Sequence, residues 1–401
     1  MNDRHRILST VGIYHAFNDG SVAVIPLLFP IFKVLFNLSY TQVGVITGGG
    51  LLITLITQTL IGRVSDQNDF RILLSIGMLL LSGSLLLLTQ AKGFFTLLLF
   101  IFILRFSSSF FHPIGIGWIS RTFKKDRLDW AMGTQSALGD LGAFVAILTT
   151  LYIAEISGWD FPFYLWSIIG IGVLFLGVFL TQNIHKEYIT ITNTNNKKQT
   201  LNEAFSEAWE MLKRIKSLIP AFIISGAAWG ITISYLPLLL DERTTLSLSA
   251  IGIIVSIWMG IGVIVCFSYG RIQSYLGRRN TLIYAYLIVG IMSFALSFFT
   301  DITIILFIMI FLGISTFVTF PAMFSFVSEK THESIEGKTF GYILTIQLGG
   351  GTVLLFLSGV FSDIWGIWIP FTILGFLSFL VAFLLIGNRK KDVVLKQMLQ
   401  N

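Results

Sequence analysis

The stretch HKEYITITNTNNKKQT, residues 185–200, separates two long apolar halves of the chain. Hydrophobic residues make up 54% of the 401 residues and charged residues only 12%, which is typical of a protein whose exterior is largely lipid. A run this rich in Asn, Thr and Lys is too polar to cross a bilayer. We therefore interpret it as a flexible linker between two membrane-embedded halves.

Six apolar stretches lie on each side of this linker, and each is long enough to cross about 30 Å of hydrocarbon as a helix. We predict spans at 9–36, 40–62, 71–91, 94–119, 129–155, 161–182, 217–240, 248–270, 279–299, 302–328, 338–362 and 366–387. The first is too long and too polar at its centre for a cleavable signal peptide. The prediction is an all-α membrane protein with an N-terminal six-helix bundle at 1–182, a linker at 183–216, and a C-terminal six-helix bundle and cytoplasmic tail at 217–401.

The linker ends in LNEAFSEAWEML, residues 201–212, whose apolar residues recur at helical spacing. One face of this helix would carry Leu201, Phe205, Ala208, Trp209 and Leu212. We expect it to lie at the inner membrane interface, with a binding role as the alternative.

The basic residues predict the orientation of the chain in the membrane. With a cytoplasmic N-terminus, only Lys33, Lys92 and Arg243 of the 27 Lys and Arg residues fall outside, and Arg105 lies within a span. The opposite orientation would invert this bias, contrary to the positive-inside rule. We expect a multi-pass protein of the cell membrane with both termini cytoplasmic, and this placement of the charge gives no reason to expect nucleic acid as a partner.

The two halves repeat each other at an offset of 208 residues. The matched pairs are Ser39 and Ser247, Gly44 and Gly252, Gly62 and Gly270, Pro113 and Pro321, Gly133 and Gly341, Gly142 and Gly350, Gly158 and Gly366, and Pro162 and Pro370. Because each half holds six spans, both halves enter the membrane in the same direction, which predicts parallel repeats about an axis along the membrane normal. Such a pair leaves a cavity between its halves.

Several classes of site are disfavoured by residue usage. Cys266 is the only cysteine, and the five histidines show no zinc-binding spacing, so we expect no metal and no cofactor. The glycine runs at 44–50 and 348–353 lack the Lys and the strand of a phosphate loop. We interpret them, together with Gly133, Gly139 and Gly142, as close contacts between helices.

Few ionisable side chains lie deep inside the predicted spans, and they form two tiers. At 1.5 Å per residue, His15 lies about 9 Å and Asp19 about 15 Å from the inner end of span one. Arg105 lies about 16 Å from the outer end of span four, and His112 follows it two turns later on the same face. Asp140 of span five is also near mid-depth. The upper tier is Asp19, Arg105 and Asp140, and the lower tier is His15 and His112.

A lone charge at the bilayer centre costs about 2.5 to 3.5 kcal/mol, so these groups should face one another or a watery cavity. One interpretation is that Arg105 simply pins spans together through an ion pair with one aspartate. The other is that Arg105 neutralises one acid while the second exchanges protons. Because two acids face one arginine, we favour a proton-coupling site made of Asp19, Asp140 and Arg105, with Asp19 as the expected proton carrier.

Other polar and aromatic residues are candidates for solute binding or proton relay. His15 and His112 are packing residues, relay or solute contacts, with a metal pair ranked last because no third ligand lies at useful spacing. Pro113 leaves the Ser109 carbonyl without its helical donor and should bend span four, and Pro321 should repeat that bend in span ten. The remaining candidates are Asn18, Gln135, Trp229, Tyr235 and Gln347.

Two loops carry a recognisable pattern. GRVSDQNDFR, residues 62–71, and GRIQSYLGRR, residues 270–279, resemble the loop signature of the major facilitator superfamily: a Gly, an acid four residues later and a basic cluster. The first copy lacks the second Gly, and the second has Ser274 in place of the acid. The resemblance implies the major facilitator fold and a gating role for Gly62, Asp66, Arg71, Gly270, Gly277, Arg278 and Arg279.

A narrower resemblance rests on HAFNDG, PLLFPIF, LSYTQVGVITG, FFHPIG and QSALGDLGA, which are similar to the fosmidomycin-resistance-type drug exporters of that superfamily. It implies a proton-driven antiporter that exports a small organic compound, working as a monomer in the lipid bilayer. The alternatives are an importer or uniporter of a small metabolite or organic anion, a structural or receptor role, and an intramembrane enzyme. For the enzyme, the polar residues supply neither a nucleophile with a base nor a metal triad.

Overall fold

The computed structural model describes residues 2–65, 68–185, 213, 216–330 and 336–400. Within these residues all regular structure is helical. Eleven helices are long and apolar enough to cross a membrane, and a bent helix pair at the N-terminus makes a twelfth candidate span. The prediction of an all-α protein with twelve spans is therefore confirmed in these residues. The expected interfacial helix at 201–212 and the loop residue Asp66 lie outside them.

Two compact units divide the chain. Unit 1 comprises Met1–Asn196 and Thr245–Ser256, and unit 2 comprises Lys197–Thr244 and Ile257–Asn401. The helices up to residue 182 are α1 (Asp3–Leu27), α2 (Phe29–Leu35), α3 (Tyr40–Ser65), α4 (Phe70–Leu88), α5 (Phe94–Ser108), α6 (Phe111–Thr122), α7 (Lys125–Ser157) and α8 (Phe161–Thr181). After the linker come η2 (Lys216–Leu218), α10 (Ile219–Arg243), α11 (Leu248–Leu276), α12 (Arg278–Phe298), α13 (Ile302–Lys330), α14 (Glu336–Trp365) and α15 (Ile369–Gln400).

Prolines interrupt two spans of unit 1. Span one bends by 47° between α1 and α2, where Pro26 and Pro30 flank the break and neither can donate a backbone hydrogen bond. Span four breaks between α5 and α6 at Ser109, as expected from Pro113. In unit 2, α13 runs unbroken through Pro321, so the expectation of an equivalent bend in span ten is not matched by a break in the helix.

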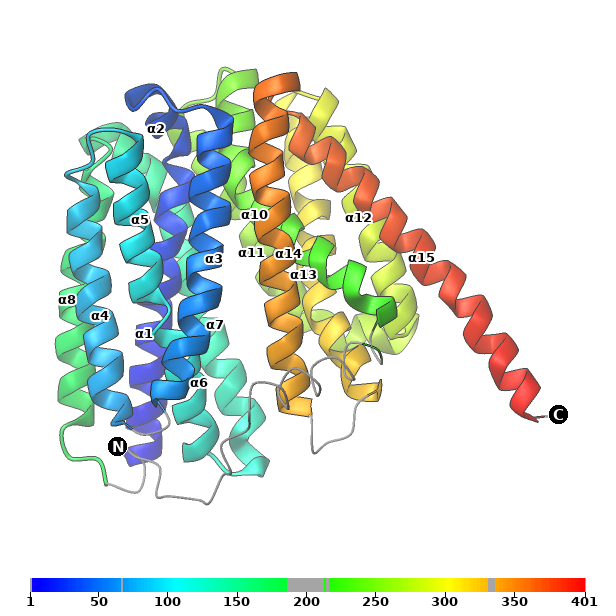
Figure 1. Cartoon of the computed structure of the whole chain (residues 1–401), viewed down its shortest axis with the longest axis horizontal. Coiled ribbons are helices and arrows are strands. Elements are labelled where there is room, and N and C mark those ends of the chain that lie inside the picture. Colours follow the sequence, from blue (N-terminus) through cyan, green and yellow to red (C-terminus); the bar gives the residue numbers. More distant parts are fainter. Residues whose placement is uncertain (1, 66–67, 186–212, 214–215, 331–335, 401) are drawn as a thin grey trace. The chain divides into compact units, whose positions relative to one another are not determined.

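Small residues let α1 lie close against α7 (Figure 1). A Cβ atom added at Gly142 would lie 2.0 Å from the backbone oxygen of Ala16, and one at Gly139 would lie 2.7 Å from the ring of His15. These two glycines are close helix contacts, as predicted. Gly133 is not, because nothing lies within 4 Å of the same position there. The polar residues of α1 are thus held against α7 by backbone contact.

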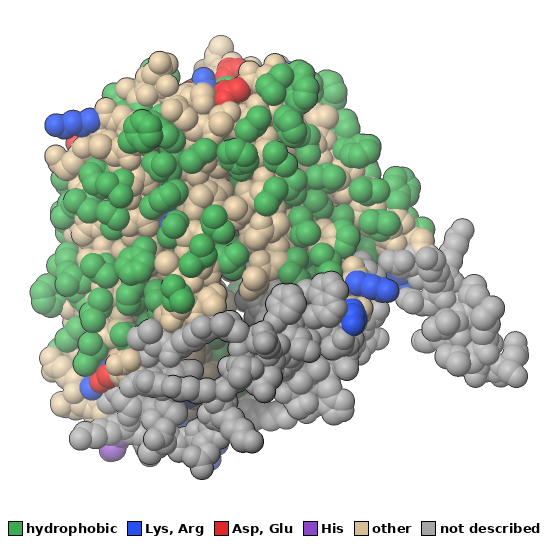
Figure 2. All heavy atoms as spheres, in the orientation of Figure 1, with side chains coloured by type: hydrophobic (Ala, Val, Ile, Leu, Met, Phe, Trp, Pro, Cys, Tyr) green, Lys and Arg blue, Asp and Glu red, His purple; other side chains and the backbone are tan. Residues whose placement is uncertain are grey.

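Apolar side chains cover the outer faces of the helices. Phe95 is 81% exposed, and Phe267 and Phe175 are similarly open. Figure 2 shows hydrophobic side chains over most of the visible face, with the few clusters of charged side chains near the helix ends. Large exposed aromatic and aliphatic side chains of this kind suit contact with lipid tails.

Candidate functional site

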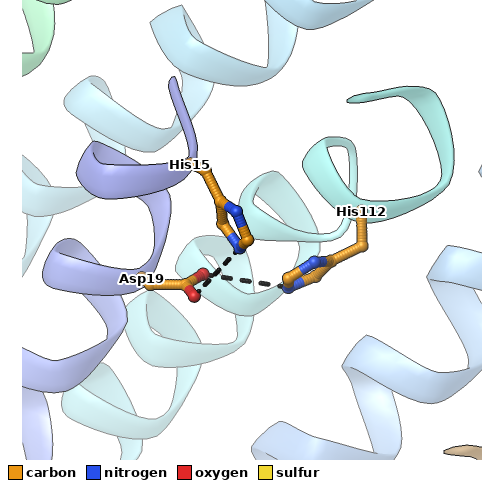
Figure 3. Close-up of side chains that lie close together, drawn as sticks. All are labelled: His15, Asp19 and His112. Carbon is orange, nitrogen blue, oxygen red and sulfur yellow. Dashed lines mark ion pairs between the residues drawn. The ribbon is translucent and has the colours of Figure 1, made fainter. Parts of the chain in front are cut away.

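His15 and Asp19 of α1 face each other one helical turn apart (Figure 3). The Nε2 atom of His15 lies 3.1 Å from Oδ2 of Asp19. The His15 side chain is only 8% exposed, whereas that of Asp19 is 27% exposed. The nearly buried imidazole of His15 therefore contacts an Asp19 carboxylate that is still partly exposed to solvent.

A second histidine reaches the same carboxylate from α6. His112 Nε2 lies 3.8 Å from Oδ1 of Asp19, and its side chain is 37% exposed. The two imidazole rings are almost perpendicular, with centroids 5.3 Å apart. The break at Ser109 lies three residues before His112, and α6 begins at Phe111, so the interrupted span helps to place this side chain. The two predicted tiers thus meet, since Asp19 of the upper tier contacts both residues of the lower one.

The tautomer of His15 follows from its other ring nitrogen. Nδ1 lies 2.9 Å from the backbone oxygen of Gln135 in α7, and a carbonyl oxygen can only accept a hydrogen bond. Nδ1 must therefore donate. The Nε2 atom then faces Asp19 either with a lone pair or with a second proton, and a lone pair directed at a carboxylate is unfavourable unless a cation lies between them.

The walls around His15 are apolar and tightly packed. Phe111 stacks on its ring with centroids 4.5 Å apart, and Gly139 leaves the space that the ring occupies on the other helix. Sequence reasoning did not assign a role to Phe111, although it lies within the quoted FFHPIG. Its position directly before His112 was the available signal.

The side-chain amides of Asn18 and Gln135 make only some of the hydrogen bonds that they could make. Asn18 donates from Nδ2 to Oδ1 of Asp19 at 2.9 Å, while its own buried Oδ1 has no partner in the described residues. The side chain of Gln135 donates to the Ser136 hydroxyl, and its Oε1 also lacks a partner there. Asn18 therefore supports the carboxylate directly, and Gln135 acts on His15 through its backbone.

Arg105 and Asp140 do not complete an ion pair in the described residues. The Nε atom of Arg105 is buried without a hydrogen-bond acceptor, and Gly50 of α3 lies next to its side chain. In the described residues, the basic side chains within 4 Å of the Asp19 carboxylate oxygens are those of His15 and His112. The expectation that Arg105 neutralises an aspartate is thus wrong for Asp19, because the histidines occupy its carboxylate. No described hydrogen bond or ion pair reaches the half-buried Asp140 carboxylate either.

The candidate binding residues in unit 2 are Trp229, Tyr235 and Gln347. Tyr235 is fully buried and donates its hydroxyl to the backbone oxygen of Leu355 at 2.8 Å, which is a packing role between α10 and α14. Gln347 donates to the Ser225 hydroxyl at 3.3 Å, and Ser225 lies 3.1 Å from the Thr319 hydroxyl. Trp229 is half-buried in α10. Sequence reasoning missed Ser225 and Thr319, because single hydroxyl residues are common in apolar helices.

The loop residues of the first repeat act at helix ends. Asp69 accepts a hydrogen bond from the backbone N–H of Arg71 and so caps α4. The same carboxylate pairs with the Arg71 guanidinium at 2.7 Å, and Arg71 also donates to the backbone oxygen of Thr181 at the end of α8. Gly62 lies in the last turn of α3. The acid that partners Arg71 here is Asp69, which sequence reasoning left without a role.

In the second loop, Gly277 has a φ of +73° and precedes α12, a conformation that favours glycine. Arg279 donates from Nε to the backbone oxygen of Leu385 in α15 at 3.1 Å, which ties two helices of unit 2. Arg278 is the first residue of α12, and Gly270 lies in α11 with open space beside it.

The apolar spans and the polar side chains within them define a multi-pass membrane protein. The sequence profile of the Major Facilitator Superfamily matches residues 11–353, and the chain belongs to that family. The fold agrees. A solved bacterial homologue of the human lysosomal transporter Spinster, inward-facing and unoccupied, superposes with a TM-score of 0.75 at 15% identity over 96% of this chain and 95% of that one. Members of this family bind small-molecule substrates and act in a membrane, and they are not enzymes.

Relatives resemble parts of the chain. The uncharacterised transporter YfnC of Bacillus subtilis is 33% identical over 109 residues, 27% of either chain. The fosmidomycin resistance protein of Escherichia coli is 31% identical over 107 residues, 27% of this chain and 26% of its own. The proton-coupled antiporter flippase LtaA of Staphylococcus saprophyticus is 23% identical over 182 residues, 44% of this chain and 45% of its own. The matched regions thus span about a quarter to under a half of these relatives.

Proposed function

We propose that the chain is a proton-coupled antiporter that exports a small organic compound by alternating access. The observation that carries this proposal is the difference between two intramembrane carboxylates of unit 1. Asp19 is held by two histidines, whereas Asp140 has no described partner. Two of the relatives, the fosmidomycin resistance protein and the proton-coupled antiporter flippase LtaA, support the same function.

Asp140 is the proton carrier in this proposal. An unpaired carboxylate inside the hydrocarbon costs about 2.5 to 3.5 kcal/mol on insertion scales, and binding a proton removes that charge. The charged groups that act on Asp140 are Asp19 and His15 of the adjacent α1, and α6 brings His112 against Asp19. The apolar α8 carries no acid or base apart from Tyr164. We therefore assign to Asp140 the proton-carrying role that the sequence led us to expect for Asp19.

Arg105 is the proposed contact for the solute. Its guanidinium has no carboxylate partner in the described residues, and its Nε atom is buried without an acceptor. Such a fork of N–H donors binds a carboxylate, phosphate or phosphonate in a bidentate manner. The exported compound therefore carries an acidic group. The same feature would suit an importer or uniporter of an organic anion, which is the second candidate.

The proposed setting is the cell membrane, with both termini cytoplasmic and the protein a monomer. The bias of Lys and Arg toward one set of loops supports this orientation. In this orientation, protons enter the cytoplasm as the compound leaves the cell.

The test has two stages. A panel of toxic acidic compounds is given to cells with and without the protein, and each compound whose toxicity falls is studied in proteoliposomes holding a pH-sensitive dye. We expect the compound and protons to move in opposite directions, and an imposed pH difference to drive accumulation of the compound. Movement in the same direction would indicate an importer. Compound flux that ignores the pH difference and moves no protons would indicate a uniporter.

A further inference from the structure

We propose that His15, Asp19 and His112 form a binding site for a divalent first-row transition metal ion of the Zn²⁺, Co²⁺ and Ni²⁺ class. The inference does not rest on the transport function proposed above. Its starting point is that one ligand atom from each of the three side chains lies within 4.8 Å of the others. Two of these residues come from α1 and the third from α6, so the site exists only in the folded bundle.

The spacing of the ligand atoms fits a metal ion. Bonds of about 2.0 Å in a tetrahedral arrangement place ligand atoms about 3.3 Å apart. His15 Nε2 lies 3.1 Å from Oδ2 of Asp19, and His112 Nε2 lies 3.8 Å from Oδ1 of the same carboxylate. Ligand atoms taken one from each residue all lie within 4.8 Å of one another. Small rotations of the more exposed His112 ring would close the remaining difference.

The donor set indicates which ions would bind. Two imidazole nitrogens with one carboxylate oxygen suit zinc, cobalt and nickel, whereas Ca²⁺ and Mg²⁺ prefer sets made of oxygen alone. Three protein ligands also leave a coordination position open, as in metal sites that bind a further molecule. The partial exposure of Asp19 and His112 leaves room for water or an oxygen of a solute at that position.

The surroundings of His15 are those of a metal ligand. A ligating histidine usually donates its other ring N–H to a carbonyl or carboxylate, which fixes its tautomer and orientation. His15 does this through Nδ1 and the backbone oxygen of Gln135, and stacking on Phe111 holds the ring plane. Nε2 is thereby directed at the carboxylate, so either a proton or a metal ion must lie between them.

A proton could occupy the gap between His15 and Asp19, but it would leave His112 unexplained. At 3.8 Å the His112 nitrogen is beyond hydrogen-bonding distance from the carboxylate. A metal ion at the centre of the cluster would engage all three groups at once. This difference favours the metal ion over a proton at this particular cluster.

The experiment uses full-length protein without a polyhistidine tag, with His5, His185 and His332 replaced by Gln. These are the other three histidines of the chain, and His185 forms a second histidine–carboxylate pair with Asp3. After chelator treatment and dialysis, the protein is titrated with Co²⁺ and followed by visible absorption, and Zn²⁺ is used to displace the cobalt. We expect one Co²⁺ per chain, displaced by Zn²⁺ and unaffected by excess Mg²⁺.

Two variants of that protein locate the site. His112→Ala should weaken binding by more than about tenfold, the lower bound for losing even a second-shell partner. His112→Cys should restore it and add a thiolate-to-cobalt absorption band that the protein with Cys266 alone lacks. Melting curves of both variants verify that they are folded. The proposal is overturned by absence of binding in the parent, by binding that survives His112→Ala, or by a folded His112→Cys protein without the new band.

Discussion

His15 presents Nε2 to the carboxylate of Asp19 at 3.1 Å while its Nδ1 is bound to the backbone of α7. One imidazole thus links the acid of α1 to the neighbouring helix. His112 reaches the opposite oxygen of the same carboxylate from α6. The cluster therefore joins three helices of unit 1, because Asp19 meets α6 through His112 while His15 binds α7. Asp140 and Arg105 stay outside it.

The first prediction concerns the space that Gly139 leaves for His15. Gly139→Ala gains helix propensity of about 1 kcal/mol, but its Cβ would lie 2.7 Å from three ring atoms of His15. Overpacking of this kind costs about 1 to 3 kcal/mol, so we expect a lower free energy of unfolding. Gly133→Ala, on the same helix with open space, should be neutral or stabilising. Equal effects of the two substitutions in denaturant unfolding would contradict the packing around His15.

The second prediction concerns Arg105. Arg105→Gln should abolish flux of an acidic compound, and Arg105→Lys should retain part of it, because only the charge is kept. The melting temperature should not fall as it does when a buried ion pair is broken, a cost of about 3 to 5 kcal/mol, since no described carboxylate pairs with Arg105. A large loss of stability in Arg105→Gln would indicate a structural ion pair instead.

The third prediction assigns proton coupling to Asp140. Asp140→Asn keeps the size of the side chain and removes its titration, so proteoliposomes should lose accumulation driven by a pH difference while still exchanging solute for solute. Asp160→Asn serves as the control, because Asp160 lies at the start of α8, outside the polar cluster. Wild-type accumulation by Asp140→Asn, or its loss only in Asp19→Asn, would move the proton-carrying role away from Asp140.

The fourth prediction concerns the first loop. Asp69→Ala removes both the cap of α4 and the partner of Arg71, and a lost cap typically costs about 1 kcal/mol. Asp69→Ser keeps a capping oxygen but lacks the charge. We expect the melting temperature to fall most in Asp69→Ala and to be largely restored in Asp69→Ser. If Ser restores nothing, the ion pair with Arg71 contributes more than the cap.

The fifth prediction concerns orientation. On a background in which Cys266→Ser removes the native thiol, Lys92→Cys should react with a membrane-impermeant maleimide added to intact cells. Ser274→Cys should react only after the membrane is opened. Both positions are exposed, so burial does not explain a difference between them. The reverse order of reaction would place the termini outside.

Most of the fold could be predicted from the sequence, because a membrane span is a local property. About 20 consecutive apolar residues suffice to indicate a crossing helix, and the predicted spans coincide with the helices and with the bent first pair. Pro113 likewise predicted the interruption beside Ser109, since the missing N–H acts within one turn. Its repeat partner Pro321 produced no break, so a proline alone does not decide whether a helix is interrupted.

The polar residues of the candidate site could also be picked from the sequence, since each ionisable side chain inside a span is costly and therefore rare. The residues on other helices that these side chains contact could not be predicted in this way. Depth along a helix follows from residue number, whereas rotation about the helix axis is set by contacts such as Gly142 against Ala16. That rotation turned the face of α1 that carries His15 and Asp19 toward His112 rather than toward Arg105. It also supplied the third potential metal ligand that spacing along the chain did not reveal.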